Sequence, residues 1–210
     1  MGRHTLKIFR FTAVLVSILF VFTASANAQR FDAYFGMGTA QDGSSNQLID
    51  FFGAGNYLPT PSLDGVFGTF GGALMFKPSF GVGAEVLLRF RKGDYAGLGY
   101  RPIFYDFNGI WTPSLTKRIM PEFQAGLGGV NIRFYDATQP YYDYYTGQIS
   151  TFAGSISHFQ LHAGAGLRFY LSPHIFIRPQ ADLHWVRNLD EFRRQSIPSY
   201  SIAIGYSSVD

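Results

Sequence analysis

A serine and two histidines come nearest to a catalytic pattern in this sequence. Ser157 and His158 are adjacent, and His162 follows four residues later. With Glu122 or Asp182 they could form a hydrolytic triad, in which a carboxylate orients the histidine that activates the serine. The two histidines should not share a metal, because side chains four residues apart on a strand stand about 13 Å apart. No recognisable catalytic motif surrounds them, so we expect no enzyme activity, no metal and no cofactor.

Charged residues of both signs form a second group of candidates, because they occupy alternate positions within apolar segments. These residues are Glu85, Arg89, Arg91, Asp106, Glu122, Arg168, Arg178 and Asp182. Cations and anions are equal in number, and unpaired buried charge is costly, so the pattern predicts an internal network of ion pairs. The alternative is that the same charges line a conducting pore.

Tyrosines are concentrated in one predicted loop, around Asp143. They are Tyr141, Tyr142, Tyr144 and Tyr145. Tyrosine offers a large contact area at low entropic cost, as in antibody paratopes, so one interpretation is a recognition surface. The other is an aromatic belt at a membrane surface. A further loop is basic and carries Arg187, Arg193 and Arg194.

The elements that would position these residues are segments in which apolar and polar residues alternate. In the clearest, Phe159, Leu161 and Leu167 share one face, while Gln160 and Arg168 share the other. A period of two predicts a β-strand with one apolar face. The pattern recurs at about residues 31–38, 66–76, 82–91, 103–111, 122–128, 159–170, 175–185 and 200–207. The sequence therefore predicts an all-β fold, an eight-stranded antiparallel barrel.

The connections between these segments alternate in length. Short turns that contain proline lie at 77–79, 112–115 and 172–174, and longer loops lie at about 41–65, 92–98, 135–157 and 187–198. Short turns at one end and long loops at the other are typical of transmembrane barrels. We expect the termini and the turns near Ser79, Ser114 and Ser172 to be periplasmic. The loops near Ser44, Asp143 and Asp190 should then face the cell exterior.

Residues 1–28 have the pattern of a cleaved signal peptide. Arg3, Lys7 and Arg10 precede an apolar run over 11–22, and residues 26–28 supply an A-x-A cleavage site. The run is shorter than the roughly 20 residues that a membrane-spanning helix needs. The segment holds three of the 17 Lys and Arg and none of the 14 Asp and Glu, so residues 29–210 carry no net formal charge. This balance gives no basic face for nucleic acid, and the absence of cysteine excludes disulfides and thiol chemistry.

A soluble, lipocalin-like barrel is the alternative architecture, since it also has eight strands but turns its apolar residues inward around a ligand. The chain contains 24 Gly, many of them among the charged residues of the polar face. Small residues and paired charges suit a narrow, filled interior, and a soluble exterior would carry more lysine. We therefore expect the apolar face to contact lipid.

Three segments resemble the outer-membrane β-barrel superfamily that includes the transmembrane domain of outer-membrane protein A. They are YDFNG at 105–109, PEFQAGLG at 121–128 and HAGAGLRFY at 162–170. The resemblance implies a barrel domain over 29–210, located in the bacterial outer membrane. It also implies contact with outer-membrane lipid and with the machinery that inserts such barrels, and we expect a monomer.

The combined expectation is a non-enzymatic integral outer-membrane protein with a structural or surface-interaction role. Any extracellular ligand is unidentified. A narrow porin-like channel for ions or small solutes is the alternative function.

Overall fold

The computed structural model describes residues 30–42, 48–50, 55, 57–59, 61–95, 98–116, 118–143, 147–189, 192 and 194–208. The expected signal peptide over 1–28 lies outside these residues. So do Ser44, Tyr144, Tyr145, Asp190 and Arg193.

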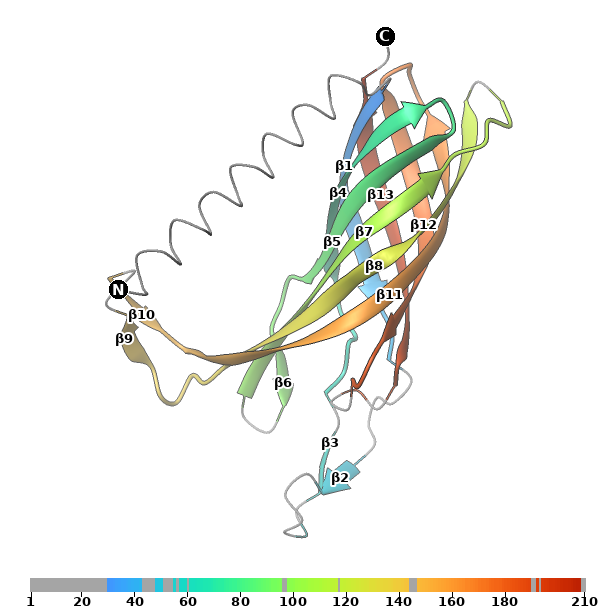
Figure 1. Cartoon of the computed structure of the whole chain (residues 1–210). Coiled ribbons are helices and arrows are strands. Elements are labelled where there is room, and N and C mark those ends of the chain that lie inside the picture. The colour runs from blue at the N-terminus through green and yellow to red at the C-terminus, as the bar shows by residue number, and fades with distance from the viewer. Residues whose placement is uncertain are drawn as a thin grey trace, which may run out of the picture.

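Eight long strands form a closed antiparallel barrel (Figure 1). They are β1 (Arg30–Ala40), β4 (Phe67–Lys77), β5 (Phe80–Arg89), β7 (Leu98–Trp111), β8 (Ile119–Tyr135), β11 (Phe152–Tyr170), β12 (Ile175–Val186) and β13 (Ser196–Ser207). They are hydrogen-bonded in the order β5-β4-β1-β13-β12-β11-β8-β7, and pairing of β5 with β7 closes the ring. The predicted fold class is confirmed.

The alternation of residue types along each strand corresponds to the two sides of the barrel wall. On β7, Phe107 points outward with 62% of its surface exposed, while neighbouring Asp106 points inward and is 3% exposed. Outward aromatic rings gather at the short-turn end, where Trp111 lies 6.4 Å from Phe80 and 5.4 Å from Phe123 between ring centroids. An apolar outer surface with an aromatic girdle is the surface that a bilayer requires, and it rules out the lipocalin-like arrangement.

The ends of the barrel differ as the connection lengths predicted. The turn between β4 and β5 is short, as are the connections β7–β8 and β11–β12. The two ends of the barrel chain meet on this side, where Phe31 N donates to Ser208 Oγ at 2.8 Å. Among the described residues, no helix has the length and apolarity to cross a membrane.

Two strands are longer than the sequence indicated. Pairing of β8 with β11 continues to Tyr135 and Phe152, so the predicted loop over 135–157 is mostly strand. We call residues 133–135 and 152–158, with the hairpin of β9 (Tyr141–Asp143) and β10 (Gln148–Ser150), the outer ribbon. Figure 1 shows it leaving the barrel and curving away from the axis. Three further short strands lie in loops at the same end, β2 (Leu48–Asp50), β3 (Tyr57–Pro59) and β6 (Gly93–Tyr95).

Candidate functional site

The interior towards the short turns is filled by charged side chains, which we call the ionic layer. Arg168 on β11 is ion-paired with Asp32 of β1 and Glu122 of β8. Arg178 on β12 donates from Nε to Glu122 Oε1 at 2.8 Å and from Nη1 to Glu85 Oε2 at 3.1 Å. Both guanidinium groups are fully buried. Glu122 therefore bridges two arginines, and the layer joins five strands.

Neutral donors and a ring complete the ionic layer. Glu85 accepts hydrogen bonds from Tyr34 Oη at 2.8 Å and from Thr69 Oγ1 at 3.1 Å. The guanidinium carbon of Arg178 lies 4.0 Å from the centre of the Tyr34 ring. Desolvation of a buried ion pair is offset only when its remaining donors and acceptors find partners. These contacts supply partners for the Glu85 carboxylate.

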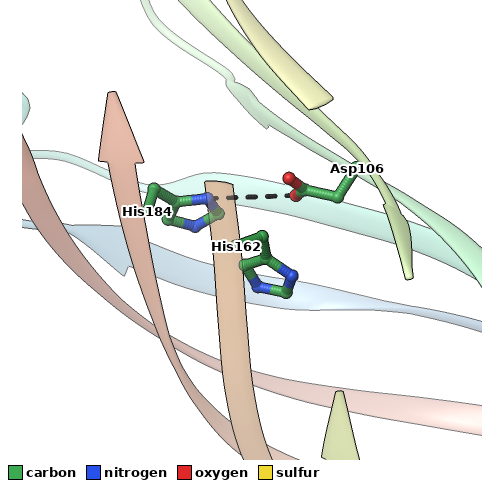
Figure 2. Close-up of side chains that lie close together, drawn as sticks. All are labelled: Asp106, His162 and His184. Atoms are coloured by element: carbon green, nitrogen blue, oxygen red, sulfur yellow. Dashed lines mark ion pairs between the residues drawn. The ribbon is translucent and has the colours of Figure 1, made fainter. Parts of the chain in front are cut away.

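A second group, the polar layer, lies further along the barrel. Asp182 Oδ1 accepts hydrogen bonds from His162 Nε2 at 3.0 Å and from Gln124 Nε2 at 3.4 Å. Gln124 Oε1 in turn accepts from Asn108 Nδ2 at 3.3 Å. His184 stacks on His162, because the two are directly paired across β11 and β12, with ring centroids 4.9 Å apart. Figure 2 shows these two rings beside Asp106 of β7.

Glycines on the inward face provide the space for these large polar side chains. A Cβ atom on Gly164 would lie 2.1 Å from Asp182 Oδ1, and one on Gly71 would lie 2.3 Å from Tyr34 Oη. Both distances are below van der Waals contact. The glycines that marked the polar face in the sequence are therefore needed for packing.

Apolar side chains fill the interior towards the long loops, and we call them the apolar layer. Its members are Ala40, Leu63, Phe67, Leu87, Tyr100, Phe104, Val130, Ile132, Val186, Leu189, Phe192 and Ile197. Leu63, Leu189 and Phe192 come from the loops rather than from barrel strands. The Phe192 ring lies 6.1 Å from that of Tyr100, so the loops close this end of the barrel.

Two of the charged candidates, Arg89 and Arg91, lie outside both the ionic layer and the polar layer. Arg89 stands near the long-loop end, where its guanidinium donates to Ser62 O at 2.9 Å and also to Asp64 O. It thus fastens the first long loop. Arg91 is exposed and follows the end of β5, so the alternation that put it inside no longer applies there. Asp32 was missed, although its position on the inward face of the first segment could have revealed it.

The residues of the hydrolytic triad are not brought together. Ser157 is exposed on the outer ribbon and accepts a hydrogen bond from Asn131 Nδ2 at 2.8 Å. His162 lies inside the barrel with Asp182. Ser157 and His162 occupy opposite faces of β11, because they are five positions apart and side chains alternate between the two faces of a strand.

The two described tyrosines of the predicted recognition loop lie on β9. Tyr141 is 48% exposed and Tyr142 is 53% exposed. The preceding turn is ordered by Asp136, which accepts hydrogen bonds from the Thr138 amide at 2.8 Å and hydroxyl at 2.6 Å. These hydrogen bonds lower the pKa of the Asp136 carboxyl.

Comparisons with known proteins identify the architecture. No protein-family model matches the chain, and no curated protein sequence resembles it. Among solved structures, outer membrane protein OprG of Pseudomonas aeruginosa aligns with a TM-score of 0.55 and 15% identity, over 88% of this chain and 98% of OprG. Neisserial surface protein A (NspA) gives 0.53 and 10% identity, over 86% and 97% of the two chains. The chain has the fold of the small outer-membrane barrels.

A third neighbour has a bound ligand. Ail, the attachment invasion locus protein of Yersinia pestis, aligns with a TM-score of 0.51 and 15% identity, over 86% of this chain and 99% of Ail. Ail has also been solved in complex with the heparin analogue sucrose octasulfate.

Proposed function

We propose that this chain is a monomeric, non-enzymatic protein of the bacterial outer membrane whose barrel is a closed scaffold for a surface-interaction ribbon. The observation that carries the proposal is the filled interior. The ionic, polar and apolar layers follow one another along the barrel, and the last of them includes loop residues. An eight-stranded barrel has an interior that side chains can just fill. Closure of the sheet within one chain supports a monomer.

The outer ribbon supports the surface role. It extends beyond the barrel and presents Tyr141, Tyr142 and Ile149, the last with 75% of its surface exposed. Exposed aromatic and apolar groups on an ordered element suit recognition. Exposed Arg133 adds a positive charge to the ribbon. The complex of Ail with sucrose octasulfate shows that one protein of this fold binds a ligand. Because the ribbon also carries Asp143 on β9, its charge is balanced, and no preference for anions extends to this chain.

Single-channel recording distinguishes this proposal from the channel alternative. Refolded protein in a planar bilayer should give no steps above roughly a few tens of picosiemens, because the filled interior leaves no wide water path. Larger steps that change in Glu122→Gln but not in the outward-facing Phe107→Ala would come from the interior. That result would make the protein a narrow channel and overturn the proposal.

A further inference from the structure

Three buried side chains from different strands come together in the polar layer. Asp106 of β7, His162 of β11 and His184 of β12 each offer a ligand atom, and these atoms all lie within 4.8 Å of one another. None of the three is more than 4% exposed. Figure 2 shows the carboxylate and both rings converging on one region of the interior.

Both histidines are held through their outer nitrogens. His162 Nε2 lies 3.0 Å from Asp182 Oδ1, and His184 Nε2 lies 3.0 Å from Ser199 Oγ. A histidine that binds a metal through one nitrogen usually donates its other N–H to a carboxylate or another oxygen, which fixes the tautomer and the ring orientation. The outer contact leaves Nδ1 of His184 as its candidate ligand atom, whereas both nitrogens of His162 have partners and one of them would exchange its partner for the ion.

The carboxylate is oriented in a similar way. Gln160 Nε2 donates to Asp106 Oδ1 at 2.5 Å. The other oxygen, Oδ2, faces His184 Nδ1 at 3.9 Å. Zinc binds imidazole nitrogen and carboxylate oxygen at about 2.0–2.2 Å, so one ion between these two atoms would reach both.

An unsatisfied nitrogen points to a missing ligand at this position. His184 Nδ1 is buried and has no hydrogen-bond partner among the described residues. Such a group costs free energy unless a partner is supplied. His162 Nδ1 is 2.9 Å from Asn108 Oδ1, so metal binding would replace that contact, while Asn108 keeps its hydrogen bond to Gln124.

We propose that Asp106, His162 and His184 form a structural site for a zinc-type transition metal ion. Two imidazoles and one carboxylate suit zinc and its neighbours rather than magnesium or calcium, which prefer oxygen ligands throughout. The ion would tie β7, β11 and β12 together inside the barrel. Because it binds the folded state, it would raise the stability of the barrel in proportion to its affinity and concentration.

Metal titration of the refolded protein tests this site. Co²⁺ should bind with one-to-one stoichiometry and give the visible absorption of a tetrahedral ion with nitrogen ligands, and Zn²⁺ should displace it. His184→Gln and Asp106→Asn should each weaken binding by about tenfold or more, since even outer-sphere changes cost that much. His174→Gln is the matched control, because His174 lies at a short turn and contacts Ser207 O. It should bind Co²⁺ like the wild type.

Other results of the same experiments would contradict the metal site. Wild-type protein that binds no Co²⁺, whether the ion is added during refolding or afterwards, would overturn the proposal. So would binding that His174→Gln abolishes and His184→Gln leaves intact. If His184→Gln and Asp106→Asn lower the melting temperature equally with and without Zn²⁺, these residues do not bind the ion and the proposal is wrong. If either variant fails to refold, X-ray absorption of the zinc-loaded wild type decides, and a spectrum without imidazole scattering would exclude the site.

Discussion

Arg178 is the residue whose loss should disturb the interior most. It contacts Glu85 and Glu122, and within the described part of the chain the other hydrogen bonds to Glu85 come from the neutral side chains of Tyr34 and Thr69. Arg178→Met leaves the Glu85 carboxylate buried without a cation, so the free energy of unfolding should fall by about 3–5 kcal/mol. The double variant Arg178→Met/Glu85→Gln should lose less than the single one, since it removes the orphaned charge.

Equilibrium unfolding by urea in lipid vesicles measures this difference. Arg133→Met is the control, because Arg133 is exposed on the outer ribbon. It should change stability by no more than about 0.5 kcal/mol. A double variant whose loss of stability equals or exceeds the sum of the losses in its two single variants would show that Arg178 and Glu85 are not favourably coupled, and would contradict the prediction.

At the scale of the element, β11 combines two environments along one outward face. Leu161 points outward within the barrel, paired with Leu127 of β8 and Trp185 of β12. Ser157 points to the same face but lies on the outer ribbon. Leu161→Arg should cost about 2–4 kcal/mol of unfolding free energy, because a lipid-facing arginine near the bilayer centre is poorly solvated. Ser157→Arg should be nearly neutral. Refolding equilibria in vesicles compare them, and a harmless Leu161→Arg would contradict the membrane position of this strand.

The alternation of apolar and polar residues predicted the barrel strands. Lipid on one face of each strand and a packed interior on the other impose this period of two. It failed over 152–157 of the outer ribbon, where β11 pairs only with β8 and exposed residues such as Phe152 and Ser155 follow no such rule. It also failed for Arg91, which lies past the end of β5. The grouping of Asp106 with His162 and His184 could not be predicted from spacing, because it depends on the register between strands far apart in the sequence.

At the scale of the whole molecule, the two ends of the barrel are chemically different. The short-turn end has the ionic layer and both ends of the barrel chain, whereas the long-loop end has the apolar layer and the outer ribbon. A surface-interaction role requires the outer ribbon to face the cell exterior. Transmembrane barrels of this type place short turns in the periplasm and long loops outside.

Labelling of single cysteines on whole cells tests this orientation. The chain has no native cysteine, so each introduced thiol is unique. Gln139 is exposed in the turn before β9, and Ser114 is exposed in the short connection between β7 and β8. Gln139→Cys and Ser114→Cys therefore place one accessible thiol at each end of the barrel. A membrane-impermeant maleimide should label Gln139→Cys on intact cells, and should label Ser114→Cys only after the outer membrane is permeabilised. Neither position lies in a barrel strand, so both variants should fold and denatured samples should label equally. Labelling of Ser114→Cys but not Gln139→Cys on intact cells would reverse the orientation, place the outer ribbon in the periplasm, and remove the basis for a role at the cell surface.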